Sequence, residues 1–222
     1  MRLLLPILCL ALACGPATPP AGESETGETR TAFGAASGVT RAGGQGAQPR
    51  VIPLQALSGD VEILFGDPDT PGEAFVMRIR ELPGTKIPLH THPVDEHLTV
   101  VQGTFYFAVG ETWESEALKE MRSGAYAFVP KGTTMFGYAP EGAIVQVHGV
   151  GPFHIHWRDG LKLLDDAGES GPFRFRKGEH VRTPRGRGTI RQGYASGTLV
   201  QYEIEGEGGN LFMADEVEVA RW

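Results

Sequence analysis

Between residues 51 and 157, short apolar segments alternate with turns that contain glycine or proline. Seven of these segments have the length of β-strands, at residues 61–65, 74–82, 97–101, 104–109, 125–129, 144–150 and 153–157. The dipeptides Asp67-Pro68, Pro83-Gly84 and Gln102-Gly103 mark turns. Helical spacing occurs only at residues 113–121, which is enough for one or two turns. The pattern predicts an antiparallel β-sandwich or barrel.

A second strand pattern begins near residue 171, after a charged, glycine-containing stretch at residues 158–171 that is expected to be a linker. Turn residues divide the segment that follows into four or five short strands, with turns at residues 184–188, 196–197 and 205–209. In size and turn spacing, residues 171–222 resemble a small SH3-like β-barrel. Because this segment has its own strands and turns, we expect it to fold independently of the larger domain, residues 50–160.

The composition supports an all-β protein. The 222 residues include 31 glycines and 16 prolines, which argues against a bundle of long helices, and 41% hydrophobic residues suffice for a core. The net charge of −7 indicates no attraction to nucleic acid or anionic lipid. Residues 174–191 are nevertheless rich in arginine and lysine. We expect these charges to be solvated or to pair with acidic residues inside the chain, such as those of the following strands. Binding to an acidic surface or envelope glycan is the alternative, and no nucleic-acid partner is expected.

The N-terminus predicts export. One arginine precedes a short apolar run at residues 3–13, which is typical of a secretory signal and too short for a permanent membrane helix. Residues 11–15 resemble a bacterial lipoprotein processing site. Residues 1–14 would then form a lipoprotein-type signal peptide, and Cys14 would carry the lipid that anchors the protein to the cell envelope. A plain signal peptide cut near Ala13 is the alternative. Residues 15–49 are rich in small and polar residues and are expected to be a disordered linker.

Candidate chemistry lies in the histidines. The only cysteines are Cys9 and Cys14, which excludes disulfides, cysteine-type zinc sites and thiol catalysis from the rest of the chain. Six of the seven histidines lie between His90 and His156. In the pair 154 and 156, the three apolar neighbours share one face of the strand, so these two histidines are expected to face outward. His97 should point away from Glu96 and is interpreted as structural.

His90, His92 and Glu96 form the strongest candidate site. Residues two apart on a strand face the same side, and a turn after Pro93 brings Glu96 back to that side. Two imidazoles and one carboxylate are the set that holds a divalent first-row metal and leaves coordination positions open. For an isolated His-x-His pair, ordinary surface or core histidines are the alternative.

These residues carry a resemblance to the cupin superfamily. The spacing of Gly84, His90, His92, Glu96 and Gly103 satisfies the family's first motif. In the second motif, the family's glycine, proline and glycine are present as Gly124, Pro130 and Gly132, but methionine and alanine replace its histidine and asparagine, at positions 135 and 139. The resemblance covers residues 49–157 and implies a double-stranded β-helix, the cupin or jelly-roll barrel, with a metal in its mouth.

Met135 leaves the metal question open, since a thioether is a weak ligand for a hard metal ion. Either three protein ligands suffice, or another histidine substitutes, or the metal is lost. His148 is the candidate replacement, because it alternates with apolar residues on the strand after the second motif; a hydrogen-bonding role near the barrel mouth is the alternative. The implied cofactor is a divalent transition metal: Fe, Mn, Ni, Zn or Cu.

Two functions follow from the resemblance. One is an exported metal-dependent enzyme, dioxygenase-like or isomerase-like, acting on a small molecule inside the barrel, with Gln146, Tyr106 and Tyr138 as further polar groups near the mouth. The other is a non-catalytic small-molecule-binding or sensing module tethered to the envelope. A homodimer is left open, and no nucleotide-binding loop or nucleophile elbow is present.

Overall fold

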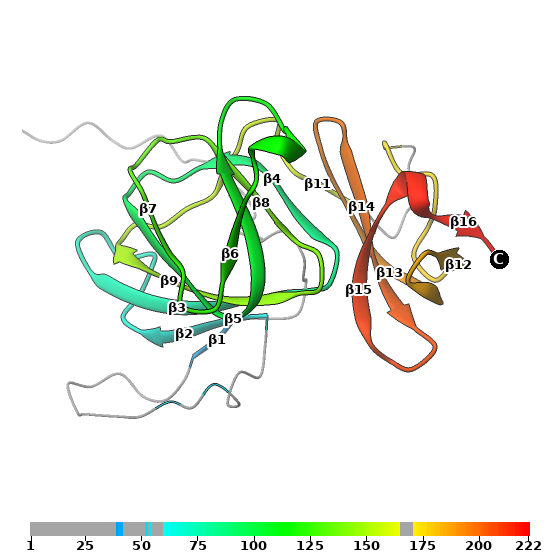
Figure 1. The fold of residues 1–222 in the computed structure, drawn as a ribbon, viewed down its shortest axis with the longest axis horizontal. Coiled ribbons are helices and arrows are strands. Elements are labelled where there is room, and N and C mark those ends of the chain that lie inside the picture. The colour runs from blue at the N-terminus through cyan, green and yellow to red at the C-terminus, as the bar shows by residue number, and fades with distance from the viewer. Residues whose placement is uncertain (1–38, 42–51, 53, 55–59, 165–170) are drawn as a thin grey trace, which may run out of the picture.

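The computed structural model describes residues 39–41, 52, 54, 60–164 and 171–222, and it consists almost wholly of β-strands. Figure 1 shows a larger, curled body of strands beside a smaller sheet that is coloured orange to red. The all-β prediction is therefore confirmed. The predicted signal peptide lies outside the described residues, as does the expected linker at residues 15–49 except for Val39–Arg41. In the described ranges, no helix has the length and apolarity needed to cross a bilayer.

The larger body is a continuous network of ten strands. Their order is β1-β2-β3-β9-β5-β8-β4-β10, with β6 and β7 also paired to β5. The strands are β1 (Val39–Arg41), β2 (Val61–Phe65), β3 (Ala74–Glu81), β4 (Thr85–Thr91), β5 (Glu96–Val109), β6 (Lys119–Arg122), β7 (Tyr126–Val129), β8 (Met135–Ala139), β9 (Ala143–Val150) and β10 (His156–Trp157). A 3-10 turn, η2 (Ser115–Ala117), precedes β6 where one or two helical turns were expected.

Strand β5 joins the two faces of the barrel. Residues 97–101 and 104–109, predicted as two strands, form one strand of 14 residues. Its first part pairs with β7 and β9, and its second part pairs with β6 and β8. Gly103 lies at this change of partners with a φ of 80°, and a β-carbon there would lie 2.6 Å from the carbonyl oxygen of Gly142. Only glycine meets both conditions, so the turn predicted at Gln102-Gly103 is a change of partners within one strand.

The barrel core follows from alternation along the strands. Six inward-facing residues of β3, β5 and β9 are apolar and almost fully buried in the core: Phe75, Met77, Leu98, Val100, Val145 and Val147. Because successive side chains point to opposite faces, the residues between them face outward. This rule decides the positions of the histidines on β5 and β9.

The C-terminal residues form a six-stranded sheet with its own core. Its order is β15-β14-β13-β12-β16, and β11 also pairs with β13. The strands are β11 (Lys162–Leu163), β12 (His180–Thr183), β13 (Gly186–Ser196), β14 (Leu199–Gly206), β15 (Leu211–Asp215) and β16 (Ala220–Arg221), with a 3-10 turn η3 (Glu216–Glu218). Val181, Ile190, Tyr202 and Ile204 are fully buried in its core. The likeness to SH3-like barrels stays a prediction.

The boundary of this sheet differs from the expected one. Residues 158–171 were expected to be a linker, yet β11 lies within them and Leu164 is buried in the C-terminal core. Because this stretch is mostly charged, its sequence did not indicate the two residues of β11 or the buried side chain of Leu164. Of the basic cluster, Arg185 pairs with Glu141 and Arg191 with Glu205, which agrees with the expected pairing inside the chain.

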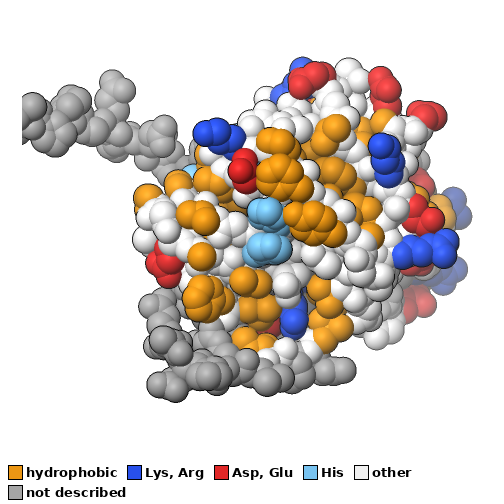
Figure 2. Space-filling model, turned by 60° about the vertical axis from the view of Figure 1, so that its left-hand side comes forward, with side chains coloured by type: hydrophobic (Ala, Val, Ile, Leu, Met, Phe, Trp, Pro, Cys, Tyr) orange, Lys and Arg blue, Asp and Glu red, His pale blue; other side chains and the backbone are white. Residues whose placement is uncertain are grey.

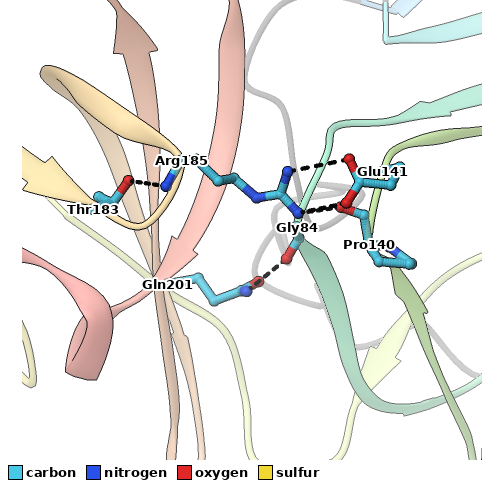
Figure 3. A network of polar contacts seen from close by, with 6 residues as sticks. All are labelled: Gly84, Pro140, Glu141, Thr183, Arg185 and Gln201. Atoms are coloured by element: carbon cyan, nitrogen blue, oxygen red, sulfur yellow. Dashed lines mark hydrogen bonds and ion pairs between the residues drawn. The ribbon is translucent and has the colours of Figure 1, made fainter.

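The C-terminal sheet is docked on the start of β4, as Figure 3 shows. The buried side chain of Gln201 accepts a hydrogen bond from the Lys86 backbone N–H at 3.0 Å and donates one to the Gly84 carbonyl at 3.0 Å. The Met213 N–H donates to the Pro83 carbonyl at 2.7 Å. Arg185 reaches the Pro140 carbonyl across the same boundary. The two sheets are therefore joined through the backbone of the strand that leads to His90 and His92.

Candidate functional site

A cavity of about 50 Å³ lies inside the barrel. Its wall is mostly apolar, and the predicted ligands His90, His92 and Glu96 all line it. The other lining residues are Ile79, Glu81, Ile87, Leu98, Phe105, Phe107, Met135, Phe136, Gly137, Val145, Val147, Phe153, Ile155 and Trp157. The volume admits a few water molecules or a ligand of few atoms.

His90 and His92 are held by backbone carbonyl groups. His90 Nδ1 lies 2.8 Å from the Pro88 carbonyl oxygen, and His92 Nδ1 lies 2.7 Å from that of His154. In this geometry each Nδ1 carries the proton and donates it to the carbonyl, so each Nε2 has a free lone pair. Such a hydrogen bond to the remote ring nitrogen is the usual support of a metal-binding histidine.

Aromatic contacts fix both rings further. The His92 ring stacks on Phe153 with centroids 4.1 Å apart, and His90 contacts Trp157 at 5.3 Å. The two imidazoles themselves meet edge to face at 5.0 Å. Residues 153, 155 and 157, predicted to form the buried side of their segment, all line the cavity. The segment after β9 both supplies a carbonyl to His92 and packs against it.

Glu96 begins β5 and faces the same cavity. Its Oε2 lies 3.8 Å from His92 Nε2, is buried, and has no hydrogen-bond partner among the described residues. Burial raises the pKa of Glu96 to about 7. Burial also lowers the pKa of His90 to about 4; for His92, burial followed by the charge of His90 lowers it to about 3. The site thus contains two neutral imidazoles and an unsatisfied carboxyl group at neutral pH.

The two imidazoles and the carboxyl group are chemically suitable ligands for a divalent transition metal. An orphaned buried carboxylate oxygen beside a free imidazole nitrogen is the arrangement that a cation would satisfy. Among the described residues, however, no three histidine, cysteine, aspartate or glutamate side chains already lie close enough together to hold one ion. A bound ion would therefore have to draw the three groups closer together than they lie here.

Met135 lies in the cavity wall where the second motif lacks its histidine. It is 2% exposed, and its backbone is opposite His90 in the β4–β8 pairing. The position that would supply a fourth ligand is therefore occupied by an apolar side chain. A thioether there adds packing contacts and little affinity for a hard metal ion.

His148 does not join this group. Val145 and Val147 of the same strand line the cavity, so His148 faces the outer surface, where its ring stacks on His97 at 4.8 Å. The physical reason is the period of two along β9, whose wholly apolar face fills the barrel. Gln146 also lies outside, where its side chain accepts a hydrogen bond from Arg78 at 3.3 Å. His148 is therefore not the replacement ligand in this structure.

The polar groups proposed near the mouth are also outside the cavity. Tyr106 and Tyr138 face each other at 6.4 Å, while their neighbours Phe105, Phe107 and Gly137 line the interior. His97 points away from Glu96, as expected. These positions again follow from alternation along the strands.

Sequence reasoning missed Glu81, a fourth titratable residue in the cavity wall. It ends β3 and is 5% exposed. Burial first, and then the charge of Asp60, raises its pKa to about 8, so Glu81 is protonated at neutral pH. The sequence did contain an indication of this position: residues 75, 77, 79 and 81 occupy one face of the strand, and the first three are apolar. Position 81 should therefore face inward.

Comparison with known proteins finds partial likenesses to solved structures. No protein-family profile and no curated protein matches the chain. Among solved structures, it is similar to a cupin-2 domain protein from Shewanella frigidimarina, at 18% identity over 35% of this chain and 71% of that one, with a TM-score of 0.30.

Two further structures are similar to part of the chain. A double-stranded β-helix protein from Klebsiella pneumoniae is 20% identical over 42% of this chain and 74% of its own, with a TM-score of 0.34. A ribosomal oxygenase from Escherichia coli is 25% identical over 35% of this chain and 22% of its own, with a TM-score of 0.32. Each likeness covers only part of the chain, and the network of ten strands itself forms the curled all-β barrel that was predicted.

Proposed function

We propose that the barrel binds one divalent transition-metal ion through His90, His92 and Glu96 and acts on a small molecule in the cavity. The observation that carries this proposal is the hydrogen bonding of the two imidazoles. Both Nδ1 atoms are engaged by backbone carbonyls, and a buried, unsatisfied Glu96 oxygen lies beside His92 Nε2. A structural pair of histidines would need neither the free nitrogen atoms nor the adjacent carboxyl group.

The metal would supply Lewis acidity and open coordination positions for a small ligand. The protein contributes the rest. Carbonyl groups orient the imidazoles, the apolar wall excludes bulk water, and Met135 leaves the fourth position to a ligand from solution. Glu81 is a protonated carboxylic acid in the same wall and can donate a hydrogen bond there. The reaction class, whether dioxygenase-like or isomerase-like, is left to experiment.

A non-catalytic binding module is the alternative function. The small cavity and its nearly apolar wall favour it, because the polar side chains among the lining residues are those of the three proposed ligands, Glu81 and Trp157. Tight binding of a small molecule without turnover would support this reading. Oxygen-dependent turnover, or isomerisation of a small molecule that needs the metal, would support the enzyme.

Elemental analysis tests the proposal directly. The chain without its first fourteen residues is purified under mild conditions and assayed for Fe, Mn, Ni, Zn and Cu, with thermal shift on adding each. One metal per barrel is expected, and His90→Ala or Glu96→Gln should remove it. His180→Gln, an exposed histidine of the C-terminal sheet, is the matched control. A wild-type protein that carries no metal and shows no thermal shift with any of the five would leave the binding module as the better account.

We also propose that the protein is exported and anchored by lipid at Cys14. The supporting features are the apolar run before Cys14, the lack of any other use for this cysteine and the small, polar residues that follow. Residues 1–14 lie outside the described residues. Cys14→Ser should release the protein from the membrane fraction of a bacterial cell, and equal membrane association of both forms would contradict the anchor.

A further inference from the structure

A row of apolar side chains and two histidines crosses the outer face of the barrel. Paired residues on five neighbouring strands form it, in the order Phe128, His97, His148, Val76 and Phe65. Phe65 and Phe128 are each 51% exposed, and Tyr126 and Val150 beside the row are exposed to a similar degree. Figure 2 shows a pair of histidines surrounded by apolar side chains on one face of the molecule.

The two imidazoles of this row are arranged as a pair. His97 and His148 are directly opposite in the β5–β9 register, and their rings lie 4.8 Å apart and nearly parallel, at 12°. Both side chains are partly exposed. Neither ring lines the barrel cavity, so the pair is separate from the site of His90, His92 and Glu96.

The hydrogen bonds of the pair are incomplete. His97 Nδ1 lies 2.6 Å from the hydroxyl group of Tyr126, which can orient this ring. His148 Nδ1 is buried and has no hydrogen-bond partner among the described residues. An unsatisfied ring nitrogen beside a second imidazole leaves nitrogen donors available, and a divalent cation that accepts nitrogen donors can take one from each ring.

We propose that His97 and His148 chelate one late first-row divalent ion, Cu(II) in preference to Ni(II) or Zn(II), on the outer face of the barrel. Because the ring planes are nearly parallel, the rings must turn about their side-chain bonds for one nitrogen of each to reach the same ion, and water fills the other positions. Imidazole suits these metals, and affinity for a given donor set is highest for Cu(II).

The test must separate this pair from the barrel site. The full chain without its first fourteen residues is studied in a barrel-silent background, His90→Ala with Glu96→Gln, by calorimetric titration with Cu(II) and by electron paramagnetic resonance of the bound ion. One Cu(II) per chain with nitrogen hyperfine structure is expected. Adding His148→Gln should weaken binding by about tenfold or more and remove the signal of the second imidazole.

Two comparisons keep the result decisive. His180→Gln in the same background should bind Cu(II) as tightly as its parent. If the barrel-silent protein does not fold, His148→Gln alone should reduce the number of Cu(II) ions bound by wild-type protein by one. Unchanged affinity in the His148→Gln variant, or no stoichiometric Cu(II) in the folded barrel-silent protein, overturns the proposal. A barrel without metal leaves the surface site unaffected, so failure of the proposed function and failure of this site are distinguishable.

Discussion

Gly84 packs directly against the backbone of Met213, so that a β-carbon on Gly84 would overlap the Met213 carbonyl oxygen. This contact joins the turn between β3 and β4 of the barrel to β15 of the C-terminal sheet. Gly84 is also the first glycine of the cupin-like motif that contains His90 and His92. A residue whose spacing suggested a role in the barrel alone thus also forms the boundary with the second sheet.

Replacing Gly84 by alanine should destabilise the protein strongly. Gly124 is the matched control, because its φ of 89° is close to the 90° of Gly84 and a β-carbon there meets nothing within 4 Å. Gly124→Ala should cost about 1 kcal/mol through the left-handed backbone alone, whereas Gly84→Ala adds the overlap with Met213. Thermal unfolding of both variants measures the difference. Equal losses of stability in the two variants would show that the contact between Gly84 and Met213 does not contribute to stability.

Substitutions of Met135 should report on the missing fourth ligand. Met135→His is expected to tighten metal binding, because position 135 is buried in the cavity wall opposite His90. Met135→Leu keeps the apolar volume and should change metal affinity little. Metal titration of the two variants compares them directly. A large loss of affinity in Met135→Leu would assign a ligand role to the thioether.

Glu81 should make the metal-free protein less stable as pH rises. Its pKa is raised by burial from 4.5 to about 8, so its contribution to stability is complete below pH 4.5 and is lost as pH rises through 8. Glu81→Gln should therefore match the wild type near pH 5 and exceed it by several degrees in Tm near pH 9. Glu116→Gln removes an exposed carboxyl group and serves as the control. Parallel pH profiles of the wild type and Glu81→Gln would contradict this account.

The C-terminal sheet should need residues before 171 to reach its full stability. Independent folding of residues 171–222 stays a prediction, but β11 pairs with β13 and Leu164 is buried in the C-terminal core. A fragment of residues 158–222 should therefore give better-dispersed amide NMR signals and a higher Tm than a fragment of residues 171–222. Poorly dispersed amide signals from both fragments would show that the docking contacts of Gln201 with the barrel are required for folding.

Local patterns in the sequence determined much of the barrel. A strand period of two places His90 and His92 on one face, and the turn after Pro93 brings Glu96 to the same cavity. The apolar segments mark most strands, since a buried face must be apolar whatever lies opposite it. Glu81 could have been placed by the same rule, because it extends the inward face of β3.

Only the tertiary structure decided how these segments combine. From the sequence, the polar face of β9 that contains His148 could have pointed into the barrel, because a metal site needs polar side chains. The actual neighbour of His148 is His97, 51 positions away, and their contact depends on the register of β5 with β9. The buried contacts of Gln201 with Gly84 and Lys86 join residues more than 110 positions apart. Strand period and turn chemistry act between near neighbours in the chain, whereas register and docking depend on packing between distant segments, which no local pattern encodes.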